Sequence, residues 1–164
     1  MAKIGLEIHV QLSTNSKLFC YCKNQANILE EIEPNSLTCV TCLGHPGSKP
    51  VLNKEAIRQA ILIGLALNCT INKETMFSRK VYFYPDLSKN FQISQYEMPL
   101  GVNGLFNKIK IKRIHLEEDP GKIVHEKGFT LVDYNRAGVP LVEIVTEPDF
   151  KDINEVSDFL NKLV

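Results

Sequence analysis

Histidine and acidic side chains recur in segments whose hydrophobic pattern is typical of β-strands. Glu7 and His9 lie in the run from Lys3 to Leu12, in which apolar residues alternate with polar or small ones. Side chains two residues apart on a strand leave the same face, with Cα atoms about 6.5 to 7 Å apart, so this pair could share one ion. An exposed polar face is the alternative interpretation of the same alternation.

Two other segments supply further acids. The run from His115 to Asp119, which also holds Glu117 and Glu118, ends a predicted strand, where a solvated group of charges is the usual explanation. Glu143 lies within an apolar strand, where an unpaired charge would cost on the order of several kcal/mol. Its carboxylate must therefore be paired, protonated or bound to a metal. Acids on three strands indicate one shared site for magnesium or manganese, and manganese accepts a histidine ligand more readily.

Basic and aromatic side chains interleave between residues 77 and 96. A metal with open coordination positions is how phosphoryl-transfer sites bind nucleotide phosphates, and nearby cations could meet phosphate or a tRNA 3' end. Tyrosines could stack on bases, although structural packing is the alternative for each one. The sequence has no phosphate-binding glycine loop, so the pattern alone leads to a metal site and not to ATP or RNA. The candidates are Arg79, Lys80, Lys89, Arg136, Tyr82, Tyr84 and Tyr96.

Four of the five cysteines form two close pairs, Cys20 with Cys22 and Cys39 with Cys42, separated by 16 residues. Four thiolates in this pattern predict a closed tetrahedral zinc site within a loop spanning residues 13–50. An iron–sulfur cluster requires the same four thiolates, and unligated cysteines in a chance pattern are the other alternative. A closed site leaves no position for water, so the predicted zinc is structural. Cys69 is interpreted as a small apolar residue near a helix end.

The elements that must position these residues are mainly strands. Strand patterns cover residues 3–12, 77–86, 90–96, 106–116, 129–134 and 141–145, and a shift in apolar parity predicts a bulge near Arg113. One helix is predicted from a cap at Asn53 to about Asn68, and another begins after Asp152. Connections too short for crossover helices favour antiparallel pairing, and the predicted class is α+β.

Composition bounds the interpretation further. The 164 residues are 44% hydrophobic and 23% charged, as expected of one globular domain or part of one. Basic and acidic residues number 19 each, so a nucleic-acid partner would have to bind to a local patch of positive charge. No secretory leader and no run of roughly 20 apolar residues is present, which predicts a soluble, cytoplasmic protein with no membrane partner. The final helix has no stop signal, so we expect the chain to continue in a longer polypeptide.

Several segments together resemble the B-type subunit of the aspartyl/glutamyl-tRNA amidotransferases. The resemblance implies that residues 1–164 are the N-terminal part of a cradle-shaped catalytic domain, similar to the glutamine synthetase and guanido kinase fold. It also implies ATP-dependent phosphorylation of the side-chain carboxylate of Glu-tRNA(Gln) or Asp-tRNA(Asn), followed by amidation with ammonia from an amidase subunit. A small linking subunit completes the implied assembly. The matching segments are Ile4–Leu12, Tyr82–Asp86, Gln92–Tyr96, His115–Asp119, Asn135–Pro140 and Glu143–Asp149.

The resemblance also implies residue roles. Glu7, His9, Glu118 and Glu143 fall on the positions that surround the catalytic magnesium, while Glu117 and Asp119 are weaker candidates, as outer or alternative ligands. The four paired cysteines match a zinc-containing branch of the family. Without the remaining domains, residues 1–164 alone are expected to be inactive. Two alternatives are a non-catalytic, zinc-stabilised RNA-binding module and the paralogous archaeal subunit specific for Glu-tRNA(Gln).

Overall fold

The computed structural model describes residues 3–164, so the first two residues of the predicted domain lie outside the described part. Within that part, neither α-helix is long and apolar enough to cross a membrane. The elements in chain order are β1 (Glu7–Gln11), the short 3-10 helix η1 (Gln25–Asn27), α1 (Lys54–Ala66), β2 (Thr70–Ile71), β3 (Ser78–Val81), β4 (Phe91–Ser94), β5 (Gly101–Phe106), β6 (Ile109–Glu118), β7 (Lys122–Glu126), β8 (Phe129–Asp133), β9 (Pro140–Thr146) and α2 (Ile153–Leu163).

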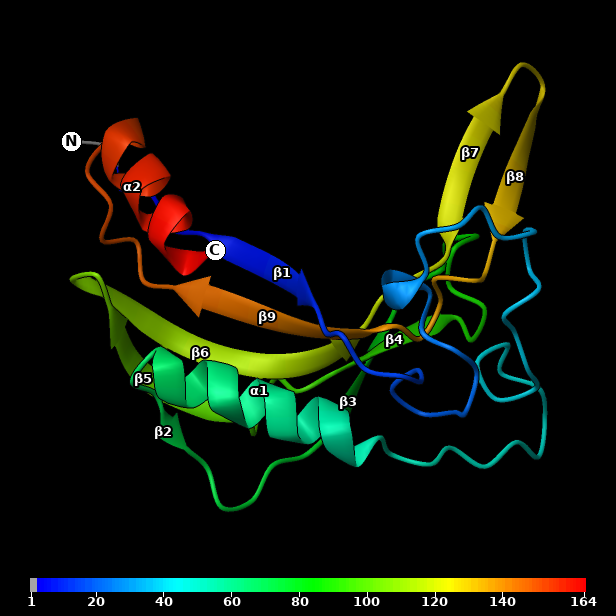
Figure 1. Cartoon of the computed structure of the whole chain (residues 1–164), viewed down its shortest axis with the longest axis horizontal. Coiled ribbons are helices and arrows are strands. Elements are labelled where there is room, and N and C mark those ends of the chain that lie inside the picture. Colours follow the sequence, from blue (N-terminus) through cyan, green and yellow to red (C-terminus); the bar gives the residue numbers. More distant parts are fainter. Residues whose placement is uncertain (1–2) are drawn as a thin grey trace.

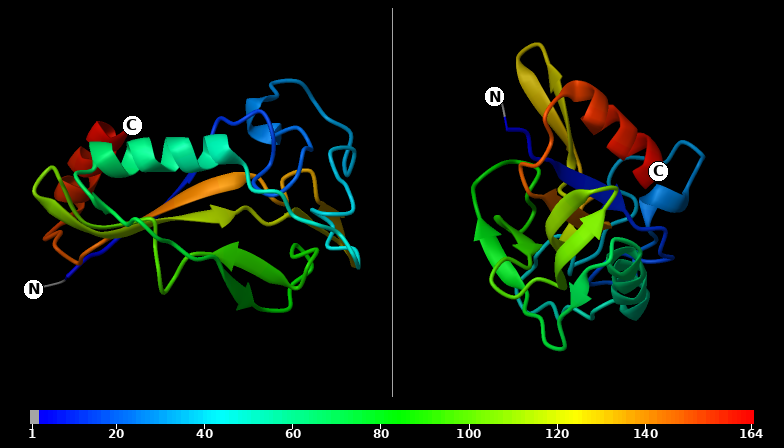
Figure 2. Two further views of the ribbon diagram at one scale, coloured as in Figure 1. Left: turned by 90° about the horizontal axis from the view of Figure 1, so that it is seen from below. Right: turned by 90° about the vertical axis from the view of Figure 1, so that its left-hand side faces the viewer.

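A five-stranded sheet forms the centre of the molecule, in the order β1-β9-β6-β5-β2. All four of its strand pairs are antiparallel. Helix α1 runs along one face of this sheet, and the β3–β4 hairpin lies against the other face (Figure 2). The predicted α+β class with a mainly antiparallel sheet is therefore confirmed.

The hydrophobic core lies mainly between α1 and the sheet. Alternation in β6 and β9 sends one set of side chains, including Ile114, Leu116 and Val142, into this core. On α1, the buried residues Ala56, Ala60 and Gly64 are all small, which lets the helix approach the strands closely. Asn53 caps the helix, as predicted, and its side chain accepts hydrogen bonds from two backbone N–H groups of the first turn.

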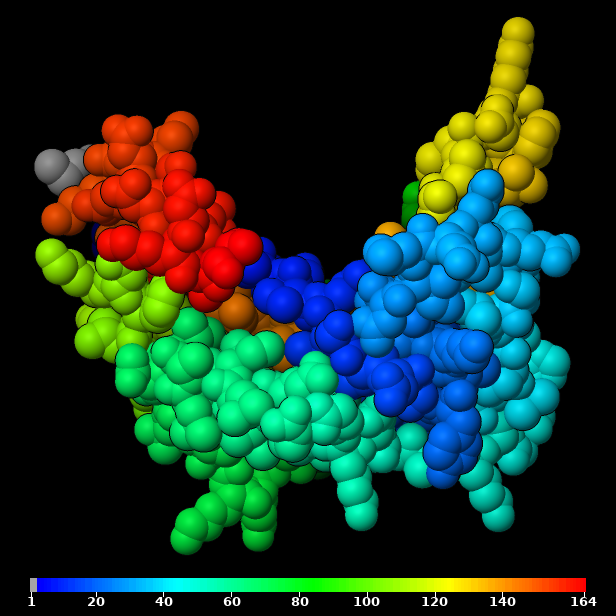
Figure 3. All heavy atoms as spheres, viewed as in Figure 1, coloured from blue at the N-terminus to red at the C-terminus, as the bar shows by residue number. Residues whose placement is uncertain are grey.

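The two ends of the sheet carry projecting elements. Helix α2, capped by Asp152 as predicted, packs through Phe159 against Phe150 and Phe106 in edge-to-face contacts. The β7–β8 hairpin rises from the opposite end (Figure 1). Between them the surface is hollowed, giving a saddle-like outline (Figure 3).

The strand predictions were incomplete in the middle of the chain. The predicted strand 106–116 is in fact the turn of a hairpin followed by β6, because Asn107 and Lys108 adopt positive φ angles of 46° and 70°. Strands β2, β5 and β7 were not predicted. The register between β6 and β9 is irregular between Ile111 and Arg113, which confirms the bulge that the parity shift predicts.

Close packing at Gly104 gives a stability prediction. A Cβ atom there would lie 2.5 Å from Cys69 Sγ and 2.8 Å from the Leu67 carbonyl oxygen. Because backbone has to move, Gly104→Ala should lower the free energy of unfolding by about 1–3 kcal/mol in urea titrations. Gly5→Ala is the matched control, because its Cβ would meet nothing closer than Pro148 Cα at 3.5 Å. Equal effects of the two substitutions would contradict this account.

Candidate functional site

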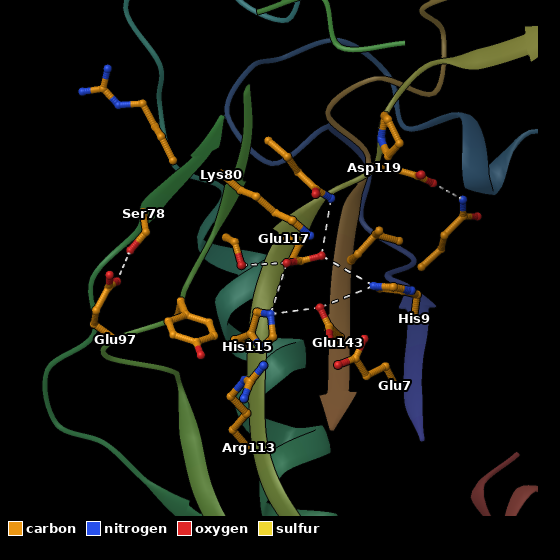
Figure 4. A pocket seen from close by; sticks show the side chains of 17 residues that line it. Glu7, His9, Ser78, Lys80, Glu97, Arg113, His115, Glu117, Asp119 and Glu143 are labelled. Carbon is orange, nitrogen blue, oxygen red and sulfur yellow. Dashed lines mark hydrogen bonds and ion pairs between the residues drawn. The ribbon is translucent and has the colours of Figure 1, made fainter. Parts of the chain in front are cut away.

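Three strands place a histidine, a carboxylate and a second histidine in one row. His9 on β1 stands opposite Glu143 on β9, and Glu143 stands opposite His115 on β6. Their side chains leave the face of the sheet that bears the β3–β4 hairpin (Figure 4). Glu143 Oε2 lies 3.4 Å from His9 Nε2 and 3.1 Å from His115 Nε2. The buried carboxylate is therefore paired on both sides.

Glu117 lies two residues after His115 on β6, so its side chain leaves the same face of the sheet. Its Oε1 atom lies 3.2 Å from His115 Nε2, and its Oε2 atom lies 3.5 Å from His9 Nε2. Ser94 Oγ donates a 2.6 Å hydrogen bond to Oε1 from β4. Glu117 is only 3% exposed, so these contacts replace the water that a carboxylate would otherwise bind.

The donor atoms of this group fit a divalent cation. Nε2 of His9 and one carboxylate oxygen each from Glu117 and Glu143 lie within 4.8 Å of one another. Neighbouring ligands about 2.1 Å from an octahedral metal are about 3 Å apart, close to the 3.4 and 3.5 Å separations around His9. The His9 side chain is 51% exposed, so among these three residues it lies on the solvent side. Buried oxygens with one imidazole are suitable ligands for magnesium or manganese.

His115 sets the electrostatics beneath the two carboxylates. The hydrogen bond from His115 lowers the pKa of Glu143 to about 2. It outweighs burial, which would raise that pKa. Burial alone would lower the pKa of His115, but hydrogen bonds to Glu117 and Glu143 outweigh burial and raise it. His115, which lies between the two carboxylates, is therefore more basic than a free imidazole.

The group lines the floor of an open cavity of about 880 Å³. Arg79 and Lys80 contribute to its wall from β3, with Lys80 directed into the cavity (Figure 4). Arg113 lies on the floor, with its guanidinium carbon 5.1 Å from the centre of the Tyr96 ring. The acidic side chains of Glu117 and Glu143 thus lie on the floor of the cavity, and the cationic side chains of Arg79, Lys80 and Arg113 lie around them.

Arg113 was not among the predicted site residues. Its Nε atom is buried and has no hydrogen-bond partner within residues 3–164, so the guanidinium keeps donor capacity for an anion. The sequence held a usable signal, because residues 113, 115 and 117 share one face of a strand. The same signal assigns His115 to the site, although in the sequence it stands within a run of charged residues.

The structure does not bring all predicted site residues together. Glu7 lines the same cavity one row away from Glu143 but is outside the group within 4.8 Å. Glu118 leaves β6 on the side away from His115, because neighbouring residues of a strand alternate, and it pairs with Lys89. Glu117 occupies the position expected for Glu118.

The remaining candidates differ in their surroundings. Arg136 donates hydrogen bonds to the carbonyl oxygens of Pro120 and Gly121, 3.0 and 2.8 Å away, and so holds the turn after β6. Tyr84 is 50% exposed, and neither Tyr82 nor Tyr84 lines the cavity. Burial raises the pKa of the Tyr82 hydroxyl.

The four paired cysteines converge in the loop before α1. The sulfur atoms of Cys20, Cys22, Cys39 and Cys42 lie within 4.8 Å of one another, and none is in a disulfide. The Cys39 and Cys42 sulfurs are 3.8 Å apart. A tetrahedron with Zn–S bonds of about 2.3 Å spaces its sulfurs about 3.8 Å apart, so this donor set fits zinc.

Fold and site together define an α+β domain with an acidic, histidine-containing cavity and a four-cysteine loop. Residues 2–164 match the GatB/GatE catalytic domain family, and the chain belongs to that family. The B-type subunit of the aspartyl/glutamyl-tRNA(Asn/Gln) amidotransferase of Methanospirillum hungatei JF-1 is 55% identical over 174 residues, covering 98% of this chain. The proteins of the same name from Haloquadratum walsbyi and Finegoldia magna are both 52% identical, covering 99% and 98% of the chain. The chain spans 36%, 35% and 35% of the lengths of these three relatives.

The cysteine geometry predicts one tightly held zinc ion per chain. Cys42→Ser should abolish stoichiometric zinc in metal analysis of protein purified without added metal and should lower the thermal midpoint. Cys69→Ala is the control for zinc content, because Cys69 is a buried cysteine outside the cluster. Four freely titrating thiols in the folded wild-type cluster, without zinc, would refute the assignment.

The raised pKa of His115 predicts a pH dependence of stability in buffer without magnesium or manganese. A raised folded-state pKa stabilises the protein fully below the ordinary value of about 6.5, and this contribution is lost as the pH rises through the folded-state pKa. The stability difference between wild type and His115→Gln in urea titrations should therefore be largest below about pH 6.5 and shrink as the pH rises above it. His125→Gln, on the exposed β7 strand, is the control. A stability difference between wild type and His115→Gln that grows with pH would contradict this prediction.

Proposed function

We propose that this chain belongs to the catalytic domain of a tRNA-dependent amidotransferase and contributes the site that phosphorylates a misacylated tRNA. ATP would phosphorylate the side-chain carboxylate of Glu-tRNA(Gln) or Asp-tRNA(Asn), and ammonia from an amidase subunit would then displace the phosphate. The observation that carries the proposal is the convergence of His9, Glu117 and Glu143 in one cavity. The names of the relatives support the same reaction class.

In this proposal Glu117 takes the role that the sequence assigned to Glu118. Glu117 and Glu143 offer oxygen ligands from the floor, and His9 offers Nε2 from the open side. Glu7, in the neighbouring row, would contribute to the site through a bound water. A bound magnesium ion would offset charge on the transferring phosphoryl group. His115 fixes the orientation of both carboxylates through its 3.1 and 3.2 Å contacts.

The cations of the cavity complete the proposed site. Arg113 and Lys80 would bind the anionic groups of the reactants, since both line the cavity that holds the carboxylates. Tyr96, which stacks on Arg113, keeps the guanidinium in place. Among the weaker sequence candidates, Arg136 would act by holding the turn after β6.

The wider assembly is part of the same proposal. We propose that the domain resembles the glutamine synthetase and guanido kinase fold, that residues 13–50 form a zinc-stabilised loop, and that the complex is cytoplasmic and includes an amidase subunit and a small linking subunit. The buried acids argue against the alternative of a non-catalytic RNA-binding module, because solvated acids would not need two histidine partners.

The decisive test is tRNA-dependent ATP turnover in the assembled enzyme. Glu117→Gln and Glu143→Gln should each lower turnover by about 100-fold or more, the usual effect of removing a group that stabilises transition-state charge. Circular dichroism should show that both variants remain folded. Glu74→Gln, in the exposed loop after β2, is the control.

A manganese-binding titration separates Glu117 from Glu118. We expect Glu117→Gln to weaken manganese binding and Glu118→Gln to lower stability through the lost Lys89 pair while leaving binding intact. Retained turnover in Glu117→Gln and Glu143→Gln would defeat the catalytic proposal. Loss of manganese binding in Glu118→Gln alone would return the ligand role to Glu118.

A further inference from the structure

Lys17 is completely buried, which is rare for a lysine. Its ammonium nitrogen lies 2.8 Å from the Leu37 carbonyl oxygen and 3.3 Å from the Tyr134 carbonyl oxygen. The third neighbour is a sulfur, Cys42 Sγ, at 3.8 Å. An ammonium group has three N–H donors, and these three contacts account for all of them.

The charge of Lys17 has no carboxylate partner. Within residues 3–164, no aspartate or glutamate lies within 4.0 Å of its ammonium nitrogen. The two carbonyl groups satisfy hydrogen bonds but carry no net charge. A buried, uncompensated ammonium is strongly unfavourable. The ionisable group in contact with the ammonium is the Cys42 thiol, 3.8 Å away, so the cysteine cluster is the counter-charge at hand. Four thiolates around one Zn²⁺ leave a net charge of about −2, which meets this need.

We propose that Lys17 is an outer partner of the zinc centre, donating an N–H group to Cys42 Sγ and offsetting one unit of the negative charge of the zinc–thiolate group. The proposal rests on zinc occupying the cluster. By withdrawing electron density from the Cys42 thiolate, Lys17 lowers its reactivity toward electrophiles and retains the metal. Lys17 is therefore a positioning residue and has no contact with the proposed catalytic cavity.

Lys17 also joins the cysteine loop to a distant part of the chain. Its contact with Tyr134 spans 117 positions of sequence, and the neighbouring Leu18 N–H donates to the Gly138 carbonyl oxygen over 2.9 Å. The Asn53 side chain donates to the Lys17 carbonyl oxygen over 3.3 Å. The lysine thus lies where the cysteine loop, the start of α1 and the β8–β9 connection meet, which explains why its side chain is held in one place.

The test replaces the charge but keeps most of the side-chain volume. In Lys17→Met, zinc affinity measured by chelator competition should fall about 10- to 100-fold, the usual effect of losing an outer partner of a metal ligand. Zinc release by a thiol-reactive mercurial should become faster, and the sulfur-to-cobalt charge-transfer band of the Co²⁺-substituted protein should shift. A lysine that only bridges the two carbonyl groups would leave this band unchanged.

Ser88→Ala is the matched control. Ser88 Oγ donates to the Cys42 carbonyl oxygen over 2.6 Å and has no hydrogen bond to the sulfur. It should leave the cobalt band and the zinc affinity close to wild type. Wild-type values in Lys17→Met, or equal losses in both variants, would overturn the proposal.

A measurement on the unmodified protein covers the case in which Lys17→Met does not fold. With ¹¹³Cd in the cluster, the Lys17 ammonium protons should show a through-bond correlation to the metal across the N–H···S hydrogen bond. Absence of that correlation with cadmium bound would overturn the proposal. A wild-type protein that binds neither zinc nor cobalt would overturn the zinc assignment and the Lys17 role, while leaving the proposed phosphorylation site untouched.

Discussion

The burial of one carboxylate in the middle of the sheet constrains most of the structure. All seven residues of β9 are buried, and Glu143 is the one ionisable residue among them. Because a buried carboxylate needs partners, β9 can be central only if its neighbours present donors at the matching positions. The antiparallel registers of β1 and β6 do so with His9 and His115. The requirements of folding and of a metal site are met by the same contacts.

The parts of the fold that follow local rules could be predicted from the sequence. Asn53 and Asp152 cap their helices as expected, and the bulge before Arg113 follows from a shift in apolar parity. Strand β5 was missed because Gly101 and Gly104 are poor strand formers and Asn103, with a φ angle of 54°, interrupts the extended backbone between them. The turn at Asn107 and Lys108 lacks glycine, so it carried no hairpin signature.

The cluster of histidine and acidic side chains was predictable in its residue types but less so in its exact members. A polar pair on β1 and a buried acid on β9 are visible from hydrophobic alternation alone. The choice between Glu117 and Glu118 depends on which face of β6 looks toward Glu143, and that is fixed by strand pairing between residues far apart in sequence. Lys17 is harder still, because its burial arises from contacts with Leu37 and Tyr134 that no local pattern announces.

Glu117 and Glu118 connect the cysteine loop to the cavity. Ser88 is hydrogen-bonded to the Cys42 backbone, and the next residue, Lys89, pairs with Glu118. Glu118 also accepts a hydrogen bond from the Ile93 N–H group, which ties the end of β6 to β4. Because Glu117 precedes Glu118 directly, fixing the backbone of one acid fixes the direction of the other. The end of β6 is therefore tied both to β4 and, through Lys89 and Ser88, to the cysteine loop.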